Sequence, residues 1–176
     1  MSLLKMRFLP DPILRKQAIK ISRIQSSFKS FTEDMIETMI DEHGVGLAAN
    51  QIGSLEKVCV IQLPDWEEAI VLINPEITHM EDEVELEEGC LSVPGYRGVT
   101  KRFEKVKVRA TGIDGKVMKI TAEGLYAQAL QHETDHLNGI IYIDKLVSKD
   151  EFYKMEFDEQ GNCSFIQVNK ETELGQ

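Results

Sequence analysis

The sequence has few cysteines and no long apolar stretch. Only three of its 176 residues are cysteine, and their scattered positions do not predict a disulfide framework. No apolar run approaches the roughly 20 residues that span a bilayer, and the first residues lack the apolar stretch and cleavage site of a secretory leader. These absences argue against a disulfide-stapled secreted scaffold and a membrane-spanning protein. They predict a reducing, cytoplasmic location.

Basic residues are also in short supply. Lysine and arginine number 20 against 30 aspartates and glutamates, which gives a net charge of −10. This balance argues against a general nucleic-acid-binding face. A local basic cluster between residues 97 and 109 fits a solvated strand face better than a binding surface. The length and ordinary composition predict a single domain over residues 1–176, in which 147–176 form a variable polar tail.

Apolar periodicity predicts two helices among several short strands. Apolar side chains recur at helical spacing from Ser27 to about Glu42, and again from Ala122 to Leu137. Asp114-Gly115 is typical of a hairpin turn. The order of elements predicts an α+β fold, with mixed or antiparallel strands packed around a central helix over residues 122–137. The expected strands cover residues 57–63, 69–73, 84–87, 105–111, 117–122 and 140–143.

The most specific motif lies on the second expected helix. Residues 131–136, Gln-His-Glu-Thr-Asp-His, contain an HExxH pattern. His132 and His136 are four positions apart, so both imidazoles project from one helix face and can bind one metal ion. The neighbouring Glu133 carboxylate can act on a water held by that metal. The pattern predicts metal-assisted hydrolysis of an amide.

A third metal ligand has to come from elsewhere in the chain. The other two histidines lie in acidic, solvated segments. Cys59 lies in a pattern typical of a buried strand, and Cys163 lies near the C-terminus. Cys90 differs, because the glycines and the proline of residues 87–95 let the backbone approach a metal closely. A thiolate and two imidazoles make a tetrahedral site with one open position. Elimination therefore favours Cys90 beside His132 and His136.

Three separate segments resemble the signature motifs of the peptide deformylase family. They match at the diagnostic positions and in the family's order, and the resemblance runs from about Leu9 to about Leu146. It implies that the chain removes the formyl group from the N-terminal formylmethionine of nascent polypeptides and releases formate. The segments are Gly44-Val45-Gly46-Leu47-Ala48-Ala49-Asn50-Gln51, Glu88-Gly89-Cys90-Leu91-Ser92 and Gln131-His132-Glu133-Thr134-Asp135-His136-Leu137-Asn138-Gly139.

The resemblance implies catalytic roles for three residues. Glu133 would take a proton from the attacking water and pass it to the leaving amine. The Gln51 side chain and the Leu91 backbone N–H would donate hydrogen bonds to the developing oxyanion. From the residues alone, Gln51 could equally cap the turn at 52–53. Charged residues that could orient the metal ligands are Glu88, Arg97, Arg102 and Asp135.

The first motif also predicts where the substrate lies. Gly44 and Gly46 allow left-handed backbone angles and leave a wall without side chains. In the family this segment pairs with the extended substrate like an added strand. By resemblance, the substrate methionine would enter an apolar pocket lined by Val45, Leu86, Leu125 and Ala129.

The expected cofactor is one divalent metal ion. A Cys-His-His site accepts ferrous iron, zinc, nickel or cobalt, and the resemblance implies Fe(II) in the cell, with the others as substitutes. The expected partners are N-formylmethionyl nascent peptides, with a transient ribosome contact. Direct nucleic-acid readout and membrane association are not expected, and the chain is expected to be a monomer or a weak dimer.

Two alternative functions stay open. A zinc peptidase could use the same HExxH motif with Glu151 or Glu156 as its third ligand, although the Cys90 segment would then be unexplained. A non-catalytic metal- or peptide-binding module would not depend on Glu133. Removal of Cys90 separates the first alternative from a deformylase, and removal of Glu133 separates the second.

Overall fold

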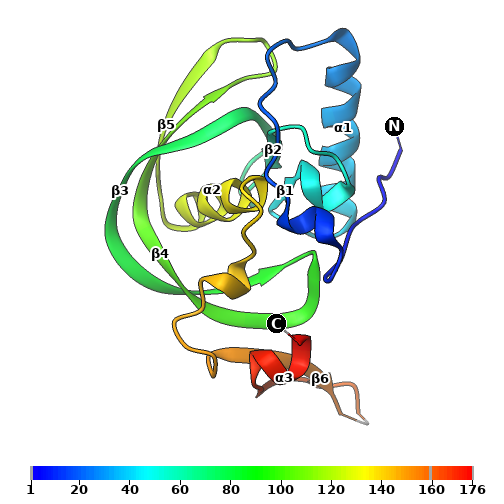
Figure 1. The fold of residues 1–176 in the computed structure, drawn as a ribbon, viewed down its shortest axis with the longest axis vertical. Helices are drawn as coiled ribbons and strands as arrows, with labels where there is room; N and C mark the ends of the chain where they lie inside the picture. The colour runs from blue at the N-terminus through cyan, green and yellow to red at the C-terminus, as the bar shows by residue number, and fades with distance from the viewer. Residues whose placement is uncertain (1, 159, 176) are drawn as a thin grey trace.

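The computed structural model describes residues 2–158 and 160–175 and has an α+β architecture. Seven strands form one sheet in the order β1-β2-β3-β4-β6-β7, and β5 pairs with β4. Every ladder between these strands is antiparallel. Helix α2 lies inside the curve of β3, β4 and β5, while helix α1 lies on the far side of β1 and β2 (Figure 1). The expected α+β class with antiparallel strands is confirmed.

The helices and strands mostly follow the expected positions. Both long helices are present, and the predicted runs 69–73 and 84–87 prove to be parts of a single strand. The bounds are α1 Ser26–Asp41, β1 Gly46–Ala48, β2 Val58–Ile61, β3 Ile70–Cys90, β4 Val93–Thr111, β5 Val117–Glu123, α2 Gly124–Leu137, β6 Phe152–Phe157, β7 Cys163–Gln167 and α3 Lys170–Leu174, with 3-10 turns at Pro12–Arg15, Ala49–Ile52 and Tyr142–Asp144.

Strand β2 is buried on both of its faces. Cys59 and Ile61 belong to the cluster around α2, whereas Val58 and Val60 belong to the cluster around α1. A strand covered on both sides has no solvent face, which explains why its sequence is a continuous apolar run. Strand β2 therefore packs against α2 on one face and against α1 on the other.

The long strands β3 and β4 form a ribbon that curves around α2. Opposite charges face each other across it, with Glu81 paired to Lys105 and Glu85 paired to Lys101. Such cross-strand pairs each contribute about 0.2–1 kcal/mol. The basic cluster on β4 is thus matched by acidic residues on β3, in agreement with the interpretation of a strand face.

The C-terminal segment, predicted only as a variable polar tail, contains regular secondary structure. Residues 147–176 include the hairpin of β6 and β7 and the short helix α3. β6 pairs with β4 on one side and with β7 on the other, and so extends the sheet (Figure 1). The strand expected over residues 140–143 is wrong, because these residues lead into a 3-10 turn at Tyr142–Asp144 and bury Ile141 and Ile143 in a core cluster. Burial without strand pairing produced the misleading apolar run.

No helix within residues 2–158 and 160–175 combines the length and the apolar character needed to cross a bilayer.

Candidate metal centre and active-site cleft

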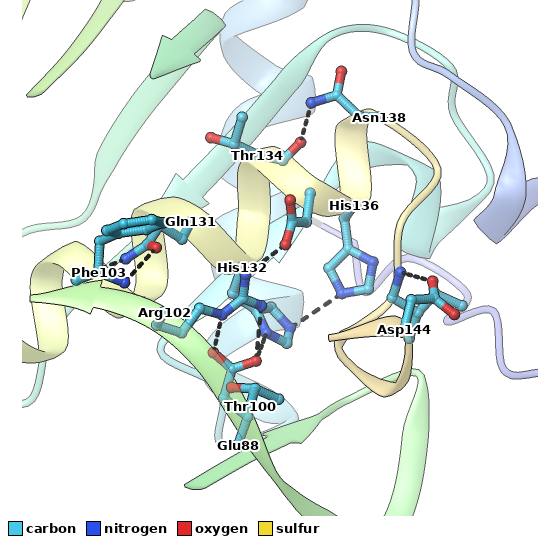
Figure 2. A network of polar contacts seen from close by, with 12 residues as sticks. Glu88, Thr100, Arg102, Phe103, Gln131, His132, Thr134, His136, Asn138 and Asp144 are labelled. Carbon is cyan, nitrogen blue, oxygen red and sulfur yellow. Dashed lines mark hydrogen bonds and ion pairs between the residues drawn. The ribbon is translucent and has the colours of Figure 1, made fainter. Parts of the chain in front are cut away.

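Helix α2 and the end of strand β3 bring together three side chains that could hold a metal ion. His132 and His136 lie one helical turn apart, and their Nε2 atoms are separated by 3.1 Å. The Cys90 Sγ atom lies 3.2 Å from Nε2 of His136. In Figure 2 both imidazoles project from α2 toward the same space. The three residues predicted as metal ligands therefore form one cluster, with one ligand atom from each within 4.8 Å of the others.

The geometry of this cluster fits a single divalent ion. Ligand atoms on one tetrahedral ion, with bond lengths of about 2.0 Å to nitrogen and 2.3 Å to sulfur, lie about 3.3–3.6 Å apart. The separations of 3.1 and 3.2 Å are close to that range. Glu88 Oε2 lies 3.2 Å from His132 Nδ1, a contact that leaves the opposite ring nitrogen, Nε2, available to bind a metal.

The charges around His132 also favour a cation. Burial by itself lowers the pKa of His132, but the neighbouring Cys90 and Glu88 side chains outweigh burial and raise this pKa well above its ordinary value. Without a metal, the cluster therefore attracts positive charge to this imidazole. A divalent cation bound by the same donors would satisfy the same electrostatic demand.

A buried ion-pair network supports the histidines from behind. Arg102 donates to both carboxylate oxygens of Glu88, at 2.7 and 2.9 Å, and to Asp135 at 2.6 Å (Figure 2). Burial raises the pKa of Glu88, but hydrogen bonds from His132 and Arg102 lower it to about 2. Glu88 is therefore ionised at neutral pH and can hold the His132 ring in place. Of the charged residues predicted for this role, only Arg97 lies apart, where it pairs with Glu87 on the surface.

Glu133 is a buried carboxylate beside the metal cluster. Its exposed fraction is 3%, and among residues 2–158 and 160–175 its Oε2 atom has no hydrogen-bond partner. Burial raises its pKa, nearby His132 lowers it and Glu88 raises it, with a net rise to about 7. A carboxyl group with a pKa near neutrality can both accept and return a proton at physiological pH. These properties suit a general base and acid.

Gln51 is placed to donate a hydrogen bond toward the cluster. Its Oε1 atom accepts from the Ala48 backbone N–H at 2.9 Å, which sets the direction of the amide. Its Nε2 atom then faces Cys90 Sγ at 3.6 Å and Ser92 Oγ at 3.2 Å. The Gln51 oxygen therefore bonds to the Ala48 N–H rather than to the turn at residues 52–53, and its nitrogen faces the metal cluster.

These residues open onto a cleft of about 700 Å³. Leu86 is not among its lining residues, because it lies two positions before Glu88 and hence about 7 Å further along the strand. His136 is also outside the lining and is fully buried. The remaining predicted site residues all line the cleft, namely Gly44, Val45, Gly46, Gln51, Cys90, Leu91, Leu125, Ala129, His132 and Glu133.

The first-motif glycines are required for space rather than for unusual backbone angles. Neither Gly44 nor Gly46 has a φ in the left-handed region, so that part of the expectation is wrong. A Cβ atom on Gly46 would lie 2.3 Å from Oε1 of Glu133, and one on Gly44 would lie 2.7 Å from a methyl group of Leu91. The second part of the expectation, a wall without side chains, describes what the structure shows.

Three further residues of the site were not singled out from the sequence. Ser92 accepts the Gln51 amide, Asn50 donates to the backbone carbonyl of His136, and the Tyr142 ring lies 6.4 Å from the His132 ring. Asn50 and Ser92 belong to the first two signature segments, so the sequence motifs could have identified them. No sequence pattern marks Tyr142, since only the path of the chain after α2 brings it behind His132.

The alternative third ligands lie away from the histidines. Glu151 accepts a hydrogen bond from Tyr153, and Glu156 is exposed on β6 opposite Ser164. Over the part of the chain that the structure describes, the only cluster of three potential metal-binding side chains is Cys90, His132 and His136. The structure thus gives no support to a peptidase-type glutamate ligand.

Comparison with known proteins agrees with this geometry. A peptide deformylase from Dehalococcoides mccartyi is 45% identical over 152 residues, covering 86% of this chain and 91% of that protein. The crystal structure of a peptide deformylase from Legionella pneumophila is 46% identical, covers 82% of this chain and 86% of its own, and superposes with a TM-score of 0.80. A Synechococcus elongatus peptide deformylase in complex with actinonin is 37% identical with a TM-score of 0.81, over 84% of this chain and 81% of its own. The polypeptide deformylase family model matches residues 3–152, and the chain therefore belongs to this family.

Proposed function

We propose that Cys90, His132 and His136 hold one divalent metal ion, with which this chain removes the formyl group from the N-terminal formylmethionine of nascent polypeptides. Deformylation is the activity of the family to which the chain belongs. The observation that carries the assignment of residues is the convergence of one thiol and two imidazoles within 4.8 Å beside a buried carboxylate. We propose Fe(II) as the ion in the cell, with zinc, nickel or cobalt as substitutes for the same donors.

Glu133 performs the proton transfers in this proposal. The metal ion, when bound, supplies Lewis acidity that activates a water and polarises the formyl carbonyl. Glu133 takes the proton from the attacking water and delivers it to the amine nitrogen as the C–N bond breaks. Formate and a free α-amino group are the products. The burial of Glu133 and its pKa of about 7 support both roles.

Gln51 and Leu91 stabilise the negative charge that develops on the formyl oxygen. The Gln51 amide nitrogen faces Cys90, and Leu91 follows Cys90 directly in the chain, so both donors border the metal cluster. A donor whose direction is set in advance does not reorganise during the reaction. The Ala48 N–H that holds Gln51 Oε1 supplies that preorganisation.

The substrate peptide lies in the cleft between the first-motif segment and the end of β3. Gly44, Val45 and Gly46 form one wall, and their backbone groups pair with the extended peptide. Leu125 and Ala129 on α2 precede the ligand histidines on the same helix face and line the space for the methionine side chain. Pairing through the backbone suits an enzyme that processes many different nascent chains.

Gly46→Ala should lower kcat by displacing Glu133. The added Cβ would lie 2.3 Å from the Glu133 carboxylate oxygen, so that the carboxylate has to move. A misplaced catalytic group of this kind costs about a hundredfold. Steady-state deformylation kinetics check this, with metal content measured in parallel. Gly112→Ala is the control, because Gly112 has no left-handed φ and the nearest atoms to a Cβ added there belong to the Asp114 and Met118 side chains, which do not line the cleft. An unchanged kcat for Gly46→Ala would contradict the contact.

Formate release from a formyl-methionyl peptide tests the proposed function. Protein reconstituted anaerobically with ferrous iron should release formate, and metal-free protein should not. If the metal-loaded protein released no formate but cleaved unformylated peptides, the proposal would be overturned in favour of a peptidase. A transient ribosome contact, a monomeric or weakly dimeric state and a cytoplasmic location stay predictions from the sequence.

A further inference from the structure

The C-terminal hairpin of β6 and β7 lies on the sheet next to the metal cluster. Gly89, directly before the ligand Cys90, pairs with Arg97 on β4. Arg97 pairs with Tyr153 on β6, and Tyr153 pairs with Gln167 on β7. Neighbouring strands are about 4.8 Å apart, so β6 runs about 10 Å and β7 about 14 Å from Gly89 across the sheet. The family model ends at residue 152, so nearly all of this hairpin lies outside it.

The two faces of the hairpin have different surroundings. On one face Phe152 is fully buried, with its ring stacked 5.1 Å from the Tyr96 ring, and this contact holds the hairpin on the core. On the other face Met155 lies opposite Phe165, and Phe157 follows two positions after Met155 on the same side. Phe157 and Phe165 are 65% and 41% exposed. The outward face is therefore an exposed apolar surface.

This apolar surface is continuous with the active-site cleft. Met155 lines the same cleft as the metal-binding Cys90 and His132, and so does Arg97. The Arg97 guanidinium lies over the Phe165 ring, 4.8 Å from its centroid, and its Nη1 atom donates to Glu87 at 2.7 Å. These two contacts tie β7 to the cleft rim. Aromatic and methionine side chains at a rim provide adaptable apolar contact area.

We propose that Met155 and Phe165 form an outer binding surface for the nascent peptide. This surface contacts apolar side chains of the third and fourth residues of the peptide. This inference rests on the proposed function. An extended peptide advances about 3.3 Å per residue. A chain whose formyl group sits at the metal cluster and which runs outward along the cleft therefore places its third and fourth residues about 10–13 Å away. The hairpin strands lie at a comparable distance.

Peptide length and composition test this surface. Three substrates are compared, namely formyl-Met-Ala-amide, formyl-Met-Ala-Leu-Leu-amide and formyl-Met-Ala-Ser-Ser-amide. The wild type should have a higher kcat/KM for the leucine peptide than for the other two, mainly through a lower KM. In the double variant Met155→Ser with Phe165→Ser, the ratio of kcat/KM for the leucine peptide to that for formyl-Met-Ala-amide should fall about tenfold, because about half of an apolar side chain is no longer buried.

Ile166→Ser provides the matched control. Ile166 is the next residue on β7, is 40% exposed and faces away from Met155 and Phe165, so its substitution should leave the ratio unchanged. A wild-type ratio near one, or the same ratio in the double variant and the wild type, would overturn the surface while leaving deformylation intact. Absence of formate from all three peptides with metal-loaded wild type would instead overturn the proposed function, and the surface with it.

Discussion

Replacing Glu133 with glutamine should lower kcat for deformylation by about 10²–10⁴-fold, the usual contribution of a general acid–base group. Glutamine keeps the shape of the side chain but can neither accept nor return the proton. Metal content should stay at the wild-type level, because Glu133 is not among the three clustered donors. Formate release and metal analysis on the same preparation measure both quantities. A variant with wild-type turnover would assign the proton transfers to another group.

The same substitution should stabilise the metal-free protein at neutral and alkaline pH. Burial raises the pKa of Glu133 from its ordinary value of 4.5 to about 7. The folded state therefore holds a proton that the unfolded state has lost between these two values, and stability falls as the pH rises through that window. Below pH 4.5 this cost is absent, and above about 7 it is complete. At about 1.4 kcal/mol for each pKa unit it amounts to about 3.5 kcal/mol.

Denaturant unfolding of metal-free protein at pH 4.5 and pH 8 checks this expectation. Glu133→Gln should exceed the wild type in free energy of unfolding at pH 8, and the difference should shrink toward pH 4.5. Glu104→Gln serves as the control, because Glu104 is a half-buried glutamate on β4 that is not part of the metal cluster. An equal difference at both pH values would show that Glu133 titrates normally. A gain in stability together with a loss of activity is the pattern expected when an active site holds a group whose burial destabilises the fold.

Cys90→Ala should abolish stable metal binding. The cluster offers three protein donors, and this change removes the only thiol among them. An even share of the roughly 10–16 kcal/mol that four-ligand zinc sites contribute is about 2.5–4 kcal/mol, which weakens affinity by about a hundred- to a thousandfold. Activity should disappear with the metal. Metal content after dialysis, measured with zinc- or nickel-loaded protein, checks the prediction without requiring turnover.

Cys163→Ala is the matched control for this experiment, since Cys163 is an exposed, free cysteine outside the cluster. Its metal content should equal that of the wild type. Retention of one tightly bound ion by Cys90→Ala would contradict the assigned ligand set and would return attention to a glutamate as the third ligand. Circular dichroism of both variants distinguishes loss of metal from loss of the fold.

The features that sequence reasoning recovered are those with a local cause. The α2 helix follows from apolar periodicity, and the pairing of His132 with His136 follows from the helical repeat. Cys59 sits in the core, as its strand pattern indicated. The failures also have physical causes. The run from Ile140 to Ile143 is apolar because it is buried, and burial alone does not distinguish a strand from an irregular segment.

The hairpin of β6 and β7 shows why the sequence did not predict the structure of the C-terminal segment. Its strands are mostly polar or exposed, so no strong alternation marks them, and their stability comes from pairing with β4 and from the stack of Phe152 on Tyr96. Contacts of this kind are made with residues far away in the sequence, and strand propensity depends on such neighbours. Its position beside the cleft is a consequence of sheet order alone.

The chain's sequence by itself determined the chemistry available, since the HExxH helix, the isolated Cys90 between glycines and the Gln51 motif are all local patterns. Only the tertiary structure decided how these parts meet. Gln51 approaches Cys90 across 39 positions of the sequence, and Cys90 approaches His136 across 46. The close approach of Gly46 to Glu133, the Arg102 network behind His132 and the placement of Met155 at the cleft likewise depend on packing. Spacing along the sequence determines only which residues are close within one helix or one turn. Residues far apart in the sequence come close because the strands and helices pack together to bury their apolar side chains.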